Sequence, residues 1–334
     1  MIYGLVLRAR HLLYDKGWKK SFSASVPTIC LGNISAGGTG KTPHTELILR
    51  TLQEIYPEKA AALSRGYKRK SRGFQTVTPD DTAYRVGDEP LQIACKFPAA
   101  EVAVDKDRVR GCEKLALTGA RVIVLDDAFQ YRRLQADLNI VLVDYSKPIF
   151  KDRLLPWGRL RDLPGRIRKA QVVIVSKCPV ELSDEERAQW RTSLKLTPDQ
   201  QLYFTTVSHC TAKPVFPEGD PHYLYAKRVI LISGIVNDTL LRNFLSDSYI
   251  ISYHLSFPDH HRFTRKDIRT IAAAAQENPL ACLITTEKDA QRLRDCTKVP
   301  QIVRERLFYV PIEATFLTEE DAEAFTSTVR SILK

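Results

Sequence analysis

The chain has 334 residues, 44% of them hydrophobic, which predicts a globular protein of about two domains and excludes a low-complexity chain. Fifty basic and 39 acidic residues give a formal net charge of +11, which predicts attraction to a polyanion: nucleic acid, anionic lipid or nucleotide. Seven cysteines without a Cys-x-x-Cys pair argue against structural zinc and a disulfide framework, and fit a reducing cytoplasm.

The first segment, residues 1–20, is predicted to form an amphipathic helix. One face carries the apolar residues Ile2, Leu5, Val6, Ala9, Leu12 and Leu13, and the basic side chains lie mostly elsewhere. This pattern is typical of a helix lying in a membrane surface, and equally of a helix packed on its own domain. Arg8 and Arg10 interrupt the stretch, so we expect no bilayer-spanning segment, and no signal-peptide cleavage site follows it.

The next feature is a glycine-rich loop between a predicted strand, Pro27–Leu31, and a predicted helix, Thr45–Gln53. Backbone N–H groups at such a loop and the helix N-terminus favour a polyphosphate, so the segment predicts a nucleotide site. Lys41 is expected to reach the β- and γ-phosphates, and the Thr42 hydroxyl to contact Mg²⁺. The residues assigned to ATP are Ser35, Ala36, Gly37, Gly38, Thr39, Gly40, Lys41 and Thr42. Ser35 stands where this motif usually opens with glycine.

After this loop, strands and helices alternate. The predicted strands are Ala61–Ser64, Val102–Val104, Arg121–Leu125, Leu138–Val143 and Gln171–Ser176, with helices such as Lys106–Leu117 and Glu185–Leu194 between them. Alternating βα units predict a doubly wound parallel sheet of the P-loop NTPase-like α/β class, which we assign to residues 21–200.

Two acidic motifs stand out in this region. Asp88 and Glu89 occupy a turn after Tyr84–Val86, where a loop carboxylate is suited to orient or deprotonate a phosphate acceptor, although Asp-Glu-Pro also commonly starts a helix. Asp126 and Asp127 end an apolar strand, the usual way of presenting carboxylates to Mg²⁺ beside a phosphate loop. A solvated strand end is the alternative for the second motif.

Two basic stretches accompany these acids. One runs over residues 65–72 and the other over 151–169, and both contain Gly or Pro as loops do. Such runs are usually solvated surface, yet here they also suit an anionic acceptor or transferred phosphate.

The C-terminal part is predicted to form a second, smaller α/β domain. A turn-rich region, residues 201–225, is assigned as the linker, and residues 226–334 as the C-terminal lobe. Its strands are predicted at Val229–Ser233, Tyr249–Leu255, Ala281–Thr285 and Leu307–Val310, and its helices at Lys266–Gln276 and Glu319–Leu333. His260 follows one strand, next to Asp259 and His261, where a histidine paired with a carboxylate from the other domain suits proton handling.

Taken together, the motifs closely resemble those of one family, the tetraacyldisaccharide 4'-kinases that phosphorylate the lipid A precursor. The resemblance covers nearly the full chain and rests on these segments in the family's order: Gly32–Asn33, Gly37–Pro43, Leu63–Tyr67, Val86–Pro90, Leu125–Gln130, Leu155–Arg161, Phe257–His260 and Thr286–Ala290. It implies transfer of the ATP γ-phosphate to the 4'-hydroxyl of a tetraacylated glucosamine disaccharide 1-phosphate, between two lobes that close on binding.

The resemblance also implies roles for individual residues. Asp88 is expected to be the catalytic base, paired with His260, and Gln130 to line the nucleotide site. The Mg²⁺ ligands are expected to be Thr42, Asp126, Asp127 and Asp162, and the substrate or phosphate contacts Arg65, Glu89 and Arg161. The partners implied are ATP, the acylated disaccharide lipid and an anionic membrane surface, without nucleic acid. The expected location is peripheral, on the cytoplasmic face of the bacterial inner membrane.

Two other functions fit parts of the chain. A P-loop GTPase or metallochaperone requires a guanine-reading Asn-Lys-x-Asp after the Gln171–Val175 strand, and residues 176–179 lack both Asn and Asp. Another P-loop ATPase that binds nucleic acid is suggested only by charge, without aromatic residues interleaved on a basic platform.

Overall fold

Strand β1 (Thr28–Asn33) lies in the middle of a large sheet because both of its faces are apolar. Ile29 and Leu31 point into one buried hydrophobic cluster and Cys30 into the other, on the opposite face of the sheet. Strand β5 (Val122–Asp126) alternates in the same way. A strand covered on both faces is a continuous apolar run, which is why the sequence pattern revealed these strands.

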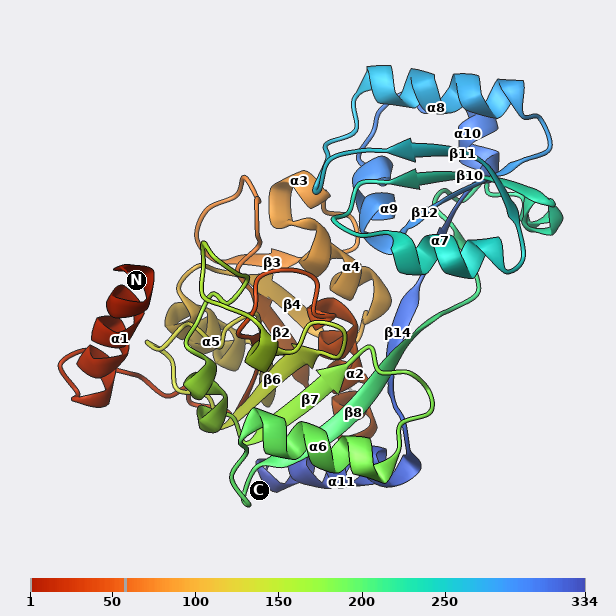
Figure 1. Ribbon diagram of the computed structural model, residues 1–334. Helices are drawn as coiled ribbons and strands as arrows, with labels where there is room; N and C mark the ends of the chain where they lie inside the picture. Colours follow the sequence, from red (N-terminus) through yellow and green to blue (C-terminus); the bar gives the residue numbers. More distant parts are fainter. Residues whose placement is uncertain (1, 57–58, 334) are drawn as a thin grey trace.

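The computed structural model describes residues 2–56 and 59–333. Within that part, the large sheet has nine strands in the order β14-β8-β7-β6-β1-β5-β2-β4-β3 (Figure 1). Its other strands are β2 Ala60–Ser64, β3 Gln75–Val77, β4 Glu101–Val104, β6 Leu138–Asp144, β7 Val172–Ser176, β8 Gln201–His209 and β14 Ile312–Phe316. Only the edge strands β3 and β14 run antiparallel to their neighbours. The predicted doubly wound parallel sheet is confirmed.

Helices cover both faces of this sheet. On one face pack α2 (Lys41–Ile55), α4 (Asp88–Lys96), which follows the short α3 (Ala83–Val86), and the C-terminal α11 (Glu319–Ser331). On the other face pack α5 (Arg108–Leu117) and α6 (Asp184–Leu194). Helix α2 begins at Lys41, four residues before the predicted start, because Pro43 is tolerated in a first helical turn.

The predicted second lobe is present as a separate sheet. Its strands β11-β10-β12-β13-β9 span Ile250–Ser256, Arg228–Ser233, Cys282–Thr286, Leu307–Val310 and Lys213–Pro214 in that order. The helices are α7 Thr239–Ser246, α8 Arg265–Glu277, α9 Glu287–Arg294 and α10 Gln301–Arg306. This lobe stands above the α3–α4 corner of the first in Figure 1.

The structure differs from the expected domain boundaries at the join. Residues 201–209 of the expected linker form β8, and β14 returns antiparallel beside it, so two extended strands connect the lobes (Figure 1). Helix α11 then packs on the first sheet, although it belonged to the expected C-terminal lobe over residues 226–334. The last described helix therefore packs on the first lobe. Residues Met1 and Lys334 of the expected segments lie outside the described residues.

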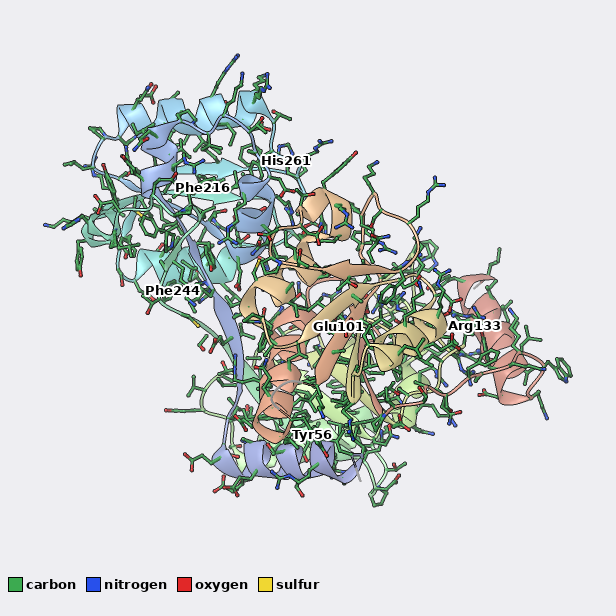
Figure 2. The ribbon with its side chains drawn as sticks, turned by 180° about the vertical axis from the view of Figure 1, so that it is seen from behind. Tyr56, Glu101, Arg133, Phe216, Phe244 and His261 are labelled. Atoms are coloured by element: carbon green, nitrogen blue, oxygen red, sulfur yellow. The ribbon has the colours of Figure 1, made fainter. Side chains whose placement is uncertain are left out.

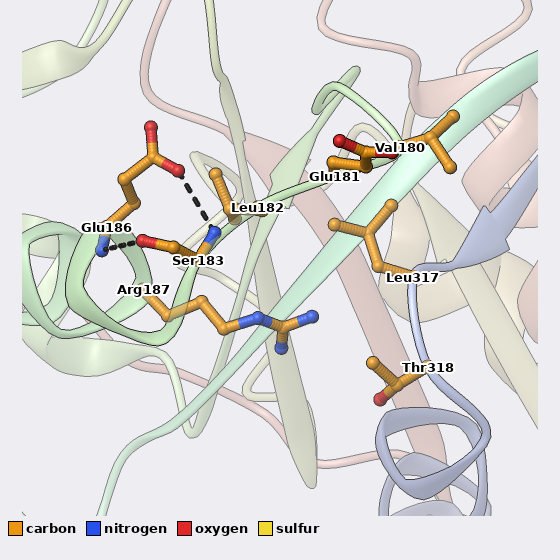
Figure 3. A pocket seen from close by; sticks show the side chains of 8 residues that line it. All are labelled: Val180, Glu181, Leu182, Ser183, Glu186, Arg187, Leu317 and Thr318. Carbon is orange, nitrogen blue, oxygen red and sulfur yellow. Dashed lines mark hydrogen bonds between the residues drawn. The ribbon is translucent and has the colours of Figure 1, made fainter.

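An ion pair and a shallow hollow lie where the chain returns to the first lobe, and Figure 3 shows the residues that line the hollow. Ser183 caps α6 in a reciprocal box with Glu186, and Arg187 of α6 lies 3.0 Å from Asp321 of α11. The hollow beside them is lined by Val180, Glu181, Leu182, Ser183, Glu186, Arg187, Leu317 and Thr318. None of these residues belongs to the site predicted from the sequence.

Helix α1 (Ile2–Asp15) lies at the edge of the first lobe (Figure 1). It is shorter than the predicted 1–20 because the backbone turns left-handed at Gly17, with φ of 72°. Its predicted apolar face points away from the domain: Ile2, Leu5 and Val6 are 80%, 60% and 58% exposed. The opposite side, with Leu7 and His11, is the buried one.

Across residues 2–56 and 59–333, the helices fall short of the length and hydropathy that a membrane crossing requires.

Phe325 tests whether α11 belongs to the first lobe. Its ring is fully buried and packs edge-to-face on Tyr203 of β8. Phe325→Ala is expected to lower the free energy of unfolding of this lobe by about 3–5 kcal/mol, because it leaves a cavity. Urea unfolding followed by circular dichroism measures the change. Glu323→Ala, on the exposed side of the same helix, is the control and should change it by less than about 0.5 kcal/mol.

Candidate active site

The glycine-rich loop is held at its flanks and open at its tip. Thr39 receives a hydrogen bond from Asn33 Nδ2 at 2.6 Å, and the Ala36 N–H donates to the Arg159 carbonyl at 2.6 Å. Gly37 and Gly38 are exposed, and a Cβ added at either would meet nothing within 4 Å. Because Gly37 and Gly40 have positive φ, the backbone can turn N–H groups toward this open space, where a phosphate fits.

Asp126 and Asp127 stand beside this loop because β1 and β5 are parallel neighbours. In their register Leu31 pairs with Asp126, so both strands end at the same edge of the sheet. Asp126 accepts a hydrogen bond from Thr45 of α2 at 3.0 Å, and Asp127 lies 3.9 Å from Lys41 Nζ. Asp127 has a φ of 49°, and strained backbone of this kind gathers at functional sites.

The two carboxyls have different electrostatics. Burial, followed by the charges of Glu89 and Asp127, raises the pKa of Asp126 to about 6. Burial also acts to raise the pKa of Asp127, but the bond from Arg161 and the charge of Lys41 outweigh it and hold that pKa below its usual range. The negative charge of Asp126 is therefore disfavoured where it stands, and a bound cation would stabilise it.

Asp88 and His260 come together from different lobes. Asp88 opens α4 after Gly87, and His260 lies in the loop after β11 with a φ of 56°. His260 Nδ1 is 3.1 Å from Asp88 Oδ2, so the pairing implied by the family resemblance is present. In the view from behind (Figure 2), His261, the next residue, is labelled at the boundary between the lobes.

The other predicted substrate residues surround this pair. Glu89 forms an ion pair with Lys288 of α9. The loop after β2 packs against the start of α4, since a Cβ at Gly87 would lie 3.4 Å from Gly66 Cα. Arg65 precedes that contact and is exposed, and Tyr67 packs edge-on to the His260 ring.

Arg161 and Gln130 both contact Asn33 at the end of β1, whereas Asp162 contacts α1. Arg161 donates to Asp127 Oδ2 at 3.1 Å and also pairs with Asn33. The Gln130 amide donates to the Asn33 carbonyl at 2.7 Å, so it supports the end of β1. Asp162 Oδ1 lies 2.7 Å from His11 Nε2 of α1, and its buried Oδ2 has no partner within the described residues.

Some residues at the site were not predicted. Lys177 follows β7, bonds to the Gly38 carbonyl and lies 2.8 Å from Asp144, so it holds the loop from the side opposite Asp127. Arg292 of α9 bonds to Asp88. Lys177 follows a predicted strand that ends at the same edge of the sheet as β1, so the sequence could have indicated it as a site residue. Arg292 lies on a charged helix, where no sequence pattern distinguishes it.

The buried His44 links the end of the glycine-rich loop to strand β8 by hydrogen bonds. Nδ1 lies 2.7 Å from the Gly40 carbonyl, which only accepts, so this nitrogen carries the proton. Nε2 therefore accepts from the Thr205 hydroxyl of β8, at 2.8 Å. Burial lowers the pKa of His44 from 6.5 to about 4, so the ring is neutral at pH 7.

Comparisons with known proteins agree on one family. The family model described as tetraacyldisaccharide-1-P 4'-kinase (LpxK) matches residues 1–333. The tetraacyldisaccharide 4'-kinase of Phocaeicola vulgatus is 39% identical over 343 aligned positions, which cover 100% of this chain and 93% of the relative. The enzyme of the same name from Porphyromonas gingivalis W83 is 38% identical, covering 96% of this chain and 92% of the relative.

A solved structure is similar over the whole chain. It is the "apo" form of LpxK from Aquifex aeolicus in complex with ATP, 28% identical, with a TM-score of 0.76. The match covers 100% of this chain and 96% of that one.

The neutral His44 predicts acid sensitivity. Below pH 6.5 the unfolded chain binds a proton at His44 that the folded protein refuses until about pH 4, so stability rises with pH across this window and falls as pH drops through it. His44→Gln retains a donor and an acceptor but does not titrate. It should therefore remove about 3 kcal/mol of the loss in unfolding free energy between pH 7 and pH 4.

Urea unfolding at a series of pH values measures this difference. His222→Gln, at an exposed histidine, is the matched control and should retain the wild-type pH dependence. An unchanged pH dependence in His44→Gln would contradict the prediction.

Proposed function

The chain belongs to the tetraacyldisaccharide-1-P 4'-kinase family, and from this membership we infer its reaction. It is a kinase that uses ATP to phosphorylate the 4'-hydroxyl of a tetraacylated glucosamine disaccharide 1-phosphate in lipid A biosynthesis. The observation that carries this conclusion is the family match over residues 1–333, which spans both the glycine-rich loop and the Asp88–His260 pair. A P-loop GTPase or metallochaperone is not favoured by the comparisons.

For ATP we propose the loop from Ser35 to Thr42. Exposed N–H groups at Gly37 and Gly38, followed by the N-terminus of α2, supply fixed positive potential for the phosphates. Lys41 adds a charge that neutralises the leaving β-phosphate and the transferred γ-phosphate. Its present contact with Asp127 is long, at 3.9 Å, so the amine can be redirected at little cost.

For Mg²⁺ we propose Thr42, Asp126 and Asp127. The residues fit, because Mg²⁺ in kinases is held by one or two carboxylates together with substrate phosphates, and the crowded, buried Asp126 gains most from a cation. When bound, the ion would neutralise charge on the β- and γ-phosphate oxygens. Asp162 fits less well, since one carboxylate oxygen is taken by His11.

For the acceptor we propose that Asp88 accepts the proton of the 4'-hydroxyl while the hydroxyl oxygen bonds to the γ-phosphorus. The bond from that phosphorus to the bridging oxygen breaks, and ADP leaves. His260 orients Asp88 through the 3.1 Å contact. The exposed Arg65, Arg161 beside Asp127 and Glu89 next to Asp88 are proposed to contact the transferred phosphate or the sugar.

We also propose that α1 lies in an anionic membrane surface, on the cytoplasmic face of the bacterial inner membrane. Its exposed face is apolar, and the adjoining segment places Trp18 (73% exposed) among basic residues. The alternative of a helix packed on the domain through this face does not fit the observed burial.

Phosphate transfer is the first prediction of the proposed function. With γ-labelled ATP, Mg²⁺ and the detergent-dispersed disaccharide 1-phosphate, the protein should transfer label to the lipid. Lys41→Met should lower this rate by roughly 10²-fold or more, because the phosphate charge loses its counter-charge. Lys266→Met, at an exposed lysine of α8, is the control. ATP hydrolysis without labelled lipid, from folded protein, would contradict the assigned acceptor.

The proposed function also predicts that α1 binds membranes through its exposed apolar side chains. Deletion of residues 1–20 would also remove contacts to the site, so substitution of exposed side chains is the sharper test. Leu5→Ser combined with Val6→Ser should lower partition into anionic vesicles at least about tenfold, because two apolar side chains no longer enter the surface. Leu280→Ser, 82% exposed on the other lobe, should not change partition. Equal binding by all three proteins would rule out α1 as the main anchor.

A further inference from the structure

Two of the charged contacts between the lobes meet at the first turn of α4. Asp88 Oδ2 accepts from Arg292 Nη2 at 2.6 Å and from Nε at 3.1 Å, and Glu89 pairs with Lys288. Arg292 and Lys288 are four residues apart on α9, so they lie on one face of that helix. The C-terminal lobe therefore offers two cations to two neighbouring acids of the first lobe.

Arg292 is fixed on its other side by its own lobe. Nη1 donates to Asp289 Oδ1 at 2.8 Å and to the Gly234 carbonyl at 3.1 Å. Asp289 is held in turn by the Gly234 N–H at 2.9 Å and the Thr286 hydroxyl at 2.7 Å. The Arg292 side chain is 9% exposed and all three guanidinium nitrogens are hydrogen-bonded, so the plane and direction of the group are determined before any substrate arrives.

The two oxygens of Asp88 consequently have different surroundings. Oδ2 is contacted by Nε and Nη2 of Arg292 and by Nδ1 of His260. Oδ1 accepts, among the described residues, only the backbone N–H of Glu89 at 3.1 Å. Oδ1 is therefore the oxygen with capacity for a new hydrogen bond.

We propose that Arg292 is a positioning residue for the phosphoryl transfer, which holds Oδ2 of Asp88 so that Oδ1 meets the acceptor hydroxyl. This inference rests on the proposed role of Asp88 as the base. The hydroxyl proton passes to Oδ1, the hydroxyl oxygen bonds to the γ-phosphorus, and ADP leaves with the electron pair of the broken bond. Arg292 stays protonated throughout and touches neither reacting atom.

Orientation of this kind reduces basicity. Burial acts to raise the pKa of Asp88, but the bond from His260 and the charges of Arg292 and Lys288 outweigh it and hold the pKa below its usual range. The charged groups around Asp88 are His260 from the β11 loop, Arg292, Lys288 and Asp289 from α9, and Glu89 on α4. A weak but fixed base suits a loose transition state, in which placement of the nucleophile matters more than proton removal.

Arg292→Gln tests the proposal. We expect kcat to fall roughly 10²-fold, because the carboxylate is no longer fixed, with KM for ATP changed less than about twofold. The acid limb of the kcat–pH profile should move to higher pH, since the pKa of Asp88 rises once the guanidinium is gone. Arg292→Lys, which retains the charge without the fork, should recover part of kcat and shift the limb less.

Arg294→Gln is the matched control on the same helix. Arg294 bonds to the Val215 carbonyl and Gln291, away from Asp88, so its loss should leave kcat and the pH profile near wild type. A kcat of Arg292→Gln within about threefold of wild type, or a loss of kcat with an unmoved acid limb, would overturn the positioning role. If the glutamine variant does not fold, Arg292→Lys decides by the same two measurements, with a smaller shift in the same direction.

Asp88→Asn separates this inference from the proposed function. If Asp88 is the base and Arg292 acts through it, Arg292→Gln should cost little further kcat in the Asp88→Asn background. Normal turnover in Asp88→Asn alone would overturn the role of Asp88 and the positioning with it. Collapsed turnover in Asp88→Asn together with additive losses in the double variant would overturn the positioning alone.

Discussion

The parallel pairing of β1 with β5 is the constraint on which the site depends. Because Leu31 pairs with Asp126, the glycine-rich loop and the acidic pair leave the sheet side by side, and α2 begins where the loop ends. The neighbouring strands deliver the remaining parts to the same edge: β2 leads to the loop with Arg65, and β7 to Lys177. Chemistry placed at one edge of a parallel sheet needs only loop residues, while the buried strands maintain the spacing.

The buried strands and the phosphate loop were predictable from the sequence, because apolar runs and turn glycines are local signals. The return of the chain through β14 to α11 was not, since it depends on pairing with β8 about a hundred residues earlier, and β8 is only half-buried. Asp88 and His260 could be brought together only through the family resemblance. The partner of Gln130 depends on the pairing of β1 with β5, and those of Asp162 and Arg292 on how α1 and the lobes pack, which no local pattern encodes.

Ion pairs make up much of the contact between the two lobes. Besides the contacts of Asp88 and Glu89, Lys96 lies 2.6 Å from the buried Glu46 of α2 and 3.6 Å from Glu287 of α9. Burying charges costs free energy unless they are well paired, so these contacts favour lobe positions in which the partners meet. Removal of one partner of such an ion pair leaves the other charge buried and unpaired. The ion pairs therefore select the arrangement of the lobes but add little free energy to their association.

Side chains of helix α1 form hydrogen bonds with residues of the candidate site. Tyr3 donates to the Arg161 carbonyl at 2.8 Å and Arg10 to the Gln130 carbonyl at 2.7 Å, beside the His11–Asp162 pair. A helix with its side chains is about 10 Å thick, so with its outer face in the lipid surface the loop that bears Arg161 stands roughly one helix diameter above the acyl chains. On the proposed membrane placement of α1, a sugar headgroup that projects from the bilayer would reach this loop, and the lipid would be phosphorylated without being extracted.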